Sequence, residues 1–213
     1  MILLSDNDLV VKLAQCDLIG EALETLESSV EDCFVLNTMR YSLRLGTPDK
    51  SIARYVGSAQ AFDRVNELLE SCQVLSEAPI DFELLEHLSE IPGIDAGEQT
   101  LFMHAKDHHT RELDYSLLTG DKRALRAICN YDQLDPFEFL RTKIVCLESC
   151  MMDMIEFHGF EHINQKVSAA RPQVVESKFD QVLRAAFGAG RNEEHCLECL
   201  RNYSSDIRWL LSY

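Results

Sequence analysis

The chain has 213 residues, of which 46% are hydrophobic and 26% are charged, and its formal net charge is −16. This composition is ordinary for a globular protein with a sizeable core. The negative charge excludes a protein that holds nucleic acid over most of its surface, because phosphate contacts require a basic face. Any nucleic-acid activity is therefore confined to a local site, helped by a metal ion or a basic partner.

Short apolar runs alternate with helical stretches over the first two thirds of the chain. Strands are predicted where an apolar run is too short for a helix, at residues 1–5, 32–38, 115–119 and 142–148. Apolar residues at helical spacing predict helices at 9–27, 48–72, 81–90, 95–107 and 121–131, and a polar turn at 107–112. This order indicates an α/β domain with a mostly parallel sheet over residues 1–148.

The rest of the chain reads as an α-helical extension, residues 149–213. Its predicted helices are 149–157, 160–170, 174–187 and 192–212, separated by Pro172 and by the glycine-rich run 187–192. Their apolar stripes need a partner surface. We therefore expect the extension to pack on the sheet domain or across the axis of a homodimer.

The location expected for the chain is the cytoplasm. Residues 1–11 do not resemble a signal peptide, since Asp6 and Asp8 interrupt them, and no apolar run has the length of a membrane span. The eight cysteines are scattered and are expected to be buried thiols, without a disulfide framework. A Cys-x-x-Cys pair beside a histidine, in the run 195–199, could indicate zinc or redox chemistry. Without a second pair at zinc-finger spacing, packing in a core is the simpler reading.

Acidic residues follow three apolar segments. Asp6 comes after the first strand, Asp121 comes after the strand at 115–119, and Glu98 lies in the first turn of the helix before that strand. Right-handed crossovers bring the carboxyl ends of parallel strands to one edge of the sheet, where function gathers. Three carboxylates at one place suit a hard divalent ion such as Mg²⁺ or Mn²⁺. The alternative is that each acid merely caps a helix.

Three ordered segments resemble the motifs of PIN domains, the nuclease fold of toxin components in bacterial toxin–antitoxin modules. They are "SDNDLVVKLAQCDLI", "DAGEQTLFMHA" and "SLLTGDKRALRAI", and the second matches the subfamily whose central motif reads Asp-x-Gly-Glu. The similarity covers about residues 1–148. It implies a PIN-like three-layer α/β/α fold with a mostly parallel sheet of four or five strands, followed by the helical extension. It also implies a metal-dependent endoribonuclease that hydrolyses RNA phosphodiester bonds.

Carried over residue by residue, the resemblance assigns Asp6, Glu98 and Asp121 as catalytic residues that hold Mg²⁺ or Mn²⁺. Asp8 and Asp95 are neighbouring carboxylates that assist, directly or through water. The implied substrate is RNA, single-stranded by expectation, although the residues themselves do not choose between RNA and DNA. An antitoxin or another protein partner is also implied.

Three cations open the helix after Asp121, namely Lys122, Arg123 and Arg126. They are candidates for binding the substrate backbone, and the equal alternative is a solvated helix face. A nucleotide-binding enzyme is disfavoured because the chain has no glycine-rich phosphate loop.

The chain departs from the family pattern at one acid. The family places a glutamate on the helix after the second strand, whereas this chain has Ser42 there, with Arg40 nearby. Asp8 or Glu148 would then have to complete the site, or the site is inactive. The alternative function is therefore a catalytically degenerate PIN-like protein that acts as a protein-interaction subunit.

Overall fold

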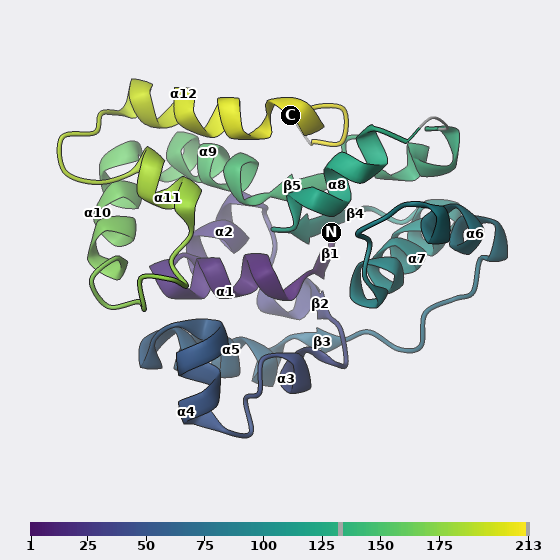
Figure 1. The fold of residues 1–213 in the computed structure, drawn as a ribbon, viewed down its shortest axis with the longest axis horizontal. Coiled ribbons are helices and arrows are strands. Elements are labelled where there is room, and N and C mark those ends of the chain that lie inside the picture. The colour runs from purple at the N-terminus through teal and green to yellow at the C-terminus, as the bar shows by residue number, and fades with distance from the viewer. Residues whose placement is uncertain (132–133, 212–213) are drawn as a thin grey trace.

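The computed structural model describes residues 1–131 and 134–211, and its centre is a single five-stranded, all-parallel sheet (Figure 1). The strands lie in the order β3-β2-β1-β4-β5. Their bounds are β1 Ile2–Ser5, β2 Cys33–Val35, β3 Gln73–Val74, β4 Tyr115–Thr119 and β5 Ile144–Cys146. The predicted α/β class and parallel sheet are confirmed. The short edge strand β3 was not predicted.

Twelve α-helices surround the sheet in the described part of the chain. Their bounds are α1 Asn7–Cys16, α2 Ile19–Thr25, α3 Met39–Ser42, α4 Pro48–Ser51, α5 Ala59–Ser71, α6 Phe82–Glu90, α7 Ala96–Thr110, α8 Lys122–Cys129, α9 Leu147–His158, α10 Phe160–Ala170, α11 Gln181–Ala186 and α12 Glu193–Ser204. A π-helical turn at Ile52–Val56 and 3₁₀ turns at Val30–Asp32, Asp135–Leu140 and Ser205–Ile207 complete the set.

The helices form one layer on each side of the sheet. Successive residues of a strand face opposite sides, and Leu3 and Leu4 of β1, both fully buried, pack into different apolar clusters. The Leu3 side is covered by α1, α2 and α9 to α12, whereas the Leu4 side is covered by α6, α7 and α8. This is the predicted three-layer α/β/α arrangement.

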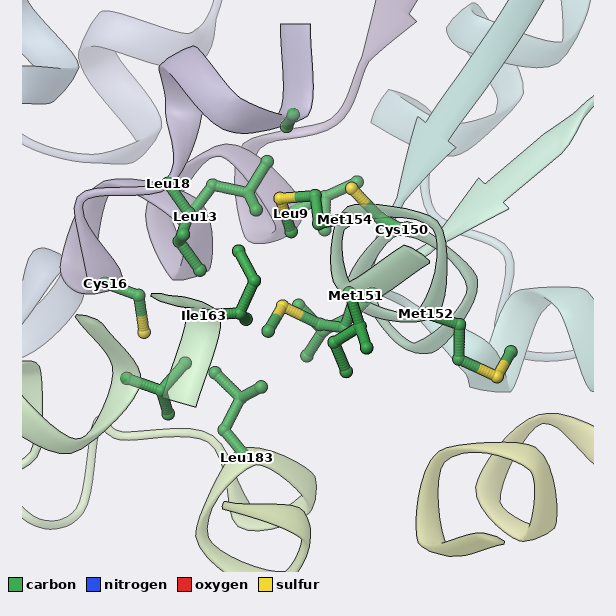
Figure 2. Packing of buried hydrophobic residues seen from close by; sticks show 14 of the residues in the cluster. Leu9, Leu13, Cys16, Leu18, Cys150, Met151, Met152, Met154, Ile163 and Leu183 are labelled. Carbon is green, nitrogen blue, oxygen red and sulfur yellow. The ribbon is translucent and has the colours of Figure 1, made fainter. Parts of the chain in front are cut away.

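The core on the Leu3 side joins the two halves of the chain. Figure 2 shows Leu9 and Leu13 of α1 lying near Met154 of α9, with Ile163 of α10 and Leu183 of α11 beside them. All five side chains are at most 5% exposed. The helical extension therefore packs on the sheet domain of its own chain, and the predicted boundary at residue 148 lies inside α9.

The end of the described chain also returns to the sheet. Leu211 forms an isolated parallel bridge with Ile144 of β5, and the Ile144 N–H donates to the Leu210 carbonyl over 3.0 Å. Residue 212, the end of the helix predicted at 192–212, lies outside the described residues. That prediction was too long, because α12 ends at Ser204.

Two predicted helices are each broken by a residue with positive φ. The helix predicted at 9–27 ends at Asp17, whose φ of 57° is left-handed, and α2 starts afresh. Aspartate tolerates this conformation better than most residues. The helix predicted at 48–72 ends at Gly57, with a φ of 83°, and Ser58 caps α5 by accepting from the Ala61 N–H.

The helix predicted at 174–187 was wrong over its first half. Only Gln181–Ala186 is helical, because Asp180 caps it by accepting from two backbone N–H groups. The preceding segment crosses Gly57 instead: the Val175 N–H donates to the Gly57 carbonyl over 2.9 Å. A Cβ at Gly57 would lie 2.8 Å from a methyl carbon of Val174, so only glycine permits this crossing.

Other differences concern element ends. The strand predicted at 142–148 is only Ile144–Cys146, since α9 begins at Leu147. The polar turn predicted at 107–112 was wrong, because α7 continues to Thr110 and includes both histidines of that stretch.

All eight cysteines lie in the described part of the chain and are free thiols, as predicted. Five are buried, whereas Cys72, Cys129 and Cys199 are only partly so. Cys196 and Cys199 of α12 contribute to the core on the Leu3 side. Among the described helices, none combines the length and apolar character that a bilayer crossing requires.

Candidate functional site

The carboxyl ends of β1 and β4 lie side by side at the point where the strand order of the sheet reverses. From this central pair the chain builds outward to β2 and β3 on one side and to β5 on the other. In open parallel sheets, ligands bind at such a switch point, outside the carboxyl ends of the strands. Asp6 follows β1 directly, and Asp121 follows β4 after Gly120. The structure therefore brings these two predicted site residues to one edge.

A buried hydroxyl group links the two acids. The Thr119 Oγ1 lies 3.5 Å from the Asp6 Oδ2 and accepts from the Asp121 N–H over 3.2 Å. Thr119 is only 5% exposed, and the Asp6 N–H is itself tied to the Leu118 carbonyl over 2.8 Å. Sequence reasoning missed Thr119. The available signal was a polar residue at the end of an otherwise apolar strand.

Three aspartates cap helices at this edge. The alternative interpretation predicted this role for Asp6 and Asp121, and Asp95 is the third. One carboxylate oxygen of each accepts a backbone N–H: Asp6 from Asn7 over 2.7 Å, Asp95 from Glu98 over 2.9 Å, and Asp121 from Arg123 over 2.8 Å. Capping engages the Oδ1 atom in each case.

Glu98 completes a capping box with Asp95 and is 7% exposed. Its Oε2 accepts from the Asp95 N–H over 2.7 Å. The pKa of Glu98 is raised to about 7, chiefly by burial. Neighbouring negative charges add to this rise, namely those of Asp121, Asp95 and Asp6. Glu98 therefore lies within electrostatic reach of all three aspartates.

Asp6 has a similar environment. Its pKa is raised to about 6, chiefly by burial, and the charges of Asp8 and Asp95 contribute to this rise against two opposing backbone hydrogen bonds. A carboxyl group with such a pKa holds a proton more readily than usual, because its charge is neither solvated nor compensated. Asp6 and Glu98 thus share an uncompensated, acidic part of the edge.

Asp121 differs because its charge is compensated by a neighbour. The Arg123 guanidinium lies 2.9 Å from the Asp121 Oδ2. Burial alone would raise the pKa of Asp121, but the hydrogen bonds and charge of Arg123 outweigh it and hold the pKa below its ordinary value. Arg123 therefore occupies the carboxylate that a metal ion would need.

Asp8 lies against the turn between Asp121 and β4. A Cβ at Gly120 would lie 2.2 Å from the Asp8 Oδ2, so the carboxylate fills the place of a side chain there. The same oxygen pairs with Lys12 over 2.6 Å, and Lys12 also pairs with Asp180 over 3.0 Å.

The cations predicted to bind substrate are all paired within the chain. Lys122 pairs with Glu148 and also donates to the Tyr203 carbonyl over 3.2 Å. Arg123 pairs with Asp121, as above, and Arg126 pairs with Asp206. Only the Arg123 side chain, 84% exposed, projects mostly into solvent.

Glu148 stands at the end of β5, next to this edge. It is 1% exposed, and its Oε2 has no hydrogen-bond partner among the described residues. Its charge is held by Lys122 alone among the described ion pairs. At the position where the PIN resemblance predicts a further acid, α3 carries Ser42, and the neighbouring Arg40 donates to the Leu69 carbonyl over 3.0 Å.

The donors at this edge are carboxylate oxygens, which suit Mg²⁺ or Mn²⁺. As the side chains stand, no group of three or more His, Cys, Asp or Glu residues within 1–131 and 134–211 is arranged so that it could hold a metal ion. Of the predicted ligands Asp6, Glu98 and Asp121, the third is paired with Arg123.

Comparison with known protein families, curated proteins and solved structures found no match to this chain.

Proposed function

We propose that the chain is a metal-dependent endoribonuclease of PIN type, which hydrolyses single-stranded RNA in the cytoplasm as part of a toxin–antitoxin or related defence system. The observation that supports this most directly is the pairing of Asp6 and Asp121 at the switch point of the sheet, joined through Thr119. Glu98 adds a third carboxylate within electrostatic reach.

The donor set fits a divalent cation on electrostatic grounds. The pKa values of Asp6 and Glu98 are raised to about 6 and 7, so each takes up a proton at a higher pH than an ordinary carboxyl group does, for want of a positive charge. A cation between them replaces those protons and relieves the repulsion. Bound there, Mg²⁺ or Mn²⁺ supplies a Lewis acid for attack of water on a phosphodiester.

The chain's own residues hold the site in place. Thr119 fixes the spacing of Asp6 and Asp121, and the capping box fixes Glu98 on the first turn of α7. Arg123, once it leaves Asp121, is the exposed cation best placed to contact a phosphate beside the acids.

Asp121→Asn tests the proposal, with Asp206→Asn as a matched control. Both aspartates pair with an arginine of α8, but Asp206 lies on the 3₁₀ turn after α12. A divalent ion that binds only the folded chain raises Tm as the ion concentration increases. At a concentration of 100 times Kd, it stabilises the folded chain by about 2.7 kcal/mol. We expect Mn²⁺ to raise the Tm of the wild type and of Asp206→Asn, but not that of Asp121→Asn.

RNA cleavage should follow the same pattern in a fluorescent assay with a single-stranded oligonucleotide. A wild type whose Tm does not respond to millimolar Mn²⁺ refutes the proposal. Equal loss of cleavage in Asp121→Asn and Asp206→Asn would also refute the assignment of the site.

A second candidate function is a protein-interaction subunit with a degenerate PIN-like site. The observation that favours it is the pairing of all three predicted substrate cations with acids of the same chain. Under this alternative neither Mn²⁺ nor RNA has an effect on the wild type. Partner binding is then unchanged in Asp121→Asn.

A further inference from the structure

Residues 39–55 form the most basic stretch of their length in an otherwise acidic chain. The stretch has one acid, Asp49. Its four cations are Arg40, Arg44, Lys50 and Arg54. No other stretch of equal length holds four cations with so few acids. It comprises α3, α4 and the π-helical turn, and Figure 1 shows α3 and α4 beyond the side of the sheet on which β2 and β3 lie.

Three of these cations have no acidic partner. Arg44, Lys50 and Arg54 are exposed and take part in none of the ion pairs of the described chain. Lys50 and Arg54 are four positions apart in one continuous helical segment, where like charges repel. Because the chain supplies no acid to relieve this repulsion, the arrangement favours an anion from outside.

Two exposed tyrosines lie among the cations. Tyr41 is 79% exposed, the highest value of any large apolar side chain in the described residues, and Tyr55 is 37% exposed. The Arg44 N–H donates to the Tyr41 carbonyl over 3.1 Å, so ring and cation belong to one turn. Proteins that bind single-stranded nucleic acid combine these two features, since bases stack on aromatic rings and cations contact the backbone.

Buried side chains hold this stretch against α1. Four of its apolar residues are at most 7% exposed and pack in one cluster with Val10 of α1. They are Met39, Leu43, Leu45 and Val56. The exposed cations and tyrosines therefore project from a backbone that the core fixes in place.

The stretch begins beside the candidate nuclease site. Leu36 follows β2, and its carbonyl accepts from the Met39 N–H at the start of α3 over 3.0 Å. A Cβ at Gly97, which lies between Asp95 and Glu98, would be 3.3 Å from a methyl carbon of Leu36. The first turn of α7, with its acids, is thus in contact with the segment that leads into α3.

We propose that residues 39–55 bind single-stranded RNA, with Arg44, Lys50 and Arg54 at its phosphates and the rings of Tyr41 and Tyr55 against its bases. The choice of RNA rests on the proposed function, whereas the binding itself requires no metal ion. The proposal also agrees with the net charge of −16, because the phosphate contacts are confined to one local surface.

The test is binding of a fluorescein-labelled, single-stranded RNA oligonucleotide, followed by fluorescence anisotropy in EDTA at several salt concentrations. Without divalent ions, binding is measured apart from cleavage. Each phosphate contact contributes about 0.7 to the slope of log K against log salt concentration, so Arg44→Gly/Lys50→Gln/Arg54→Gln should reduce the slope by about 2. Tyr41→Ala should weaken binding by about tenfold and leave the slope unchanged.

Arg171→Gln/Arg201→Gln/Arg208→Gln is the matched control. It removes three exposed cations that also lack an ion pair in the described chain but lie outside residues 39–55, and it should leave affinity and slope unchanged. Equal losses in the two triple variants overturn the proposal. So does an unlabelled polyglutamate peptide that displaces the RNA as well as unlabelled RNA does, because the surface would then take any polyanion.

The single variant Arg44→Gly guards against misfolding. Arg44 has a φ of 55°, a left-handed conformation that favours glycine, so the substitution suits the backbone while it removes one charge. It should raise Tm or leave it unchanged, and reduce the salt slope by about 0.7. An unchanged slope in this folded variant contradicts the assignment of Arg44.

Failure of this inference can be distinguished from failure of the proposed function. A wild type that binds the RNA through residues 39–55 but neither cleaves it nor responds to Mn²⁺ supports the binding surface and refutes the nuclease. A wild type that cleaves RNA, together with an Arg44→Gly/Lys50→Gln/Arg54→Gln variant that binds it as tightly, overturns the binding surface alone. Absence of RNA binding by the wild type also overturns it.

Discussion

Gly120→Ala probes the contact that brings α1 against the end of β4. Gly120 does not have a positive φ, so alanine fits the backbone, and any effect comes from the new methyl group. That Cβ would lie 2.2 Å from the Asp8 Oδ2 and 3.0 Å from its Cγ. Because real Cβ atoms do not approach so closely, the Asp8 carboxylate must turn away. Its contact with Lys12, now 2.6 Å, is then lost.

The size of the effect follows from three terms. An ion pair in which Asp8 is 48% exposed is worth about 0.5–1 kcal/mol, and a displaced rotamer costs about 0.5–1.5 kcal/mol more. The lower entropy of alanine in the unfolded chain returns about 0.4–1 kcal/mol. We therefore expect Gly120→Ala to lower the free energy of unfolding by about 1 kcal/mol. Lys12 keeps its contact with Asp180, which limits the loss.

A double-mutant cycle with Asp8→Ala isolates the contact. Without the carboxylate, Gly120→Ala should be neutral or stabilising by the same 0.4–1 kcal/mol, roughly, so the coupling free energy should be about 1–2 kcal/mol. The four proteins are compared by urea denaturation at one pH and salt concentration. If Gly120→Ala destabilises both backgrounds equally, Asp8 does not lie over Gly120 and the reasoning fails.

Two further predictions concern the charges around the site. Lys122→Met leaves Glu148, which is 1% exposed, without its cation and should lower the free energy of unfolding by about 3–5 kcal/mol. Arg126→Met breaks a pair in which each side chain is about 44% exposed and should lower it by less than about 1 kcal/mol. Equal losses of the two variants in urea denaturation contradict this assignment. The pKa values of Asp6 and Glu98, about 6 and 7, exceed the ordinary values of 3.8 and 4.5. Between these values the native state binds more protons than the unfolded state. The stability of the metal-free protein should therefore fall as pH rises from about 4 to about 7. Asp6→Asn should reduce this fall; an unchanged pH profile would show that Asp6 is not its source.

The carboxyl ends of β1 and β4, and the helix caps that follow them, could be predicted from local sequence. Asp6 and Asp121 each follow an apolar run and precede a helix, and a capping role or a shared edge follows from that order alone. Helix breaks were harder to predict when the breaking residue was not glycine or proline. Asp17 takes a left-handed φ of 57° with no signal beyond its tolerance of that conformation.

Contacts between distant segments could not be predicted. The pairing of Lys122 with Glu148 depends on α8 and α9 starting at neighbouring strand ends, and it joins residues 26 positions apart. The segment before α11 has the apolar spacing of a helix. However, Val174 and Val175 contact Gly57, which lies more than 100 residues earlier in the chain. In both cases the sequence pattern is local and the deciding partner is not.

Arg123 has two proposed roles that one substitution can distinguish. It competes with a metal ion for the Asp121 carboxylate, and it contacts the phosphate of the substrate. The charge of Asp121 is compensated by Arg123, whereas Asp6 and Glu98 take part in none of the described ion pairs and have pKa values raised to about 6 and 7. If a divalent ion binds all three acids, it must displace the guanidinium from Asp121, now 2.9 Å away.

Arg123→Met removes this competitor, so the rise in Tm at a given Mn²⁺ concentration should be larger than in the wild type. RNA cleavage should nevertheless fall, because the displaced guanidinium is the proposed phosphate contact. Arg126→Met should change neither the Tm response nor cleavage as strongly. A smaller Mn²⁺ response in Arg123→Met would contradict the competition, since losing a positive charge beside the acids can only favour a cation that binds there.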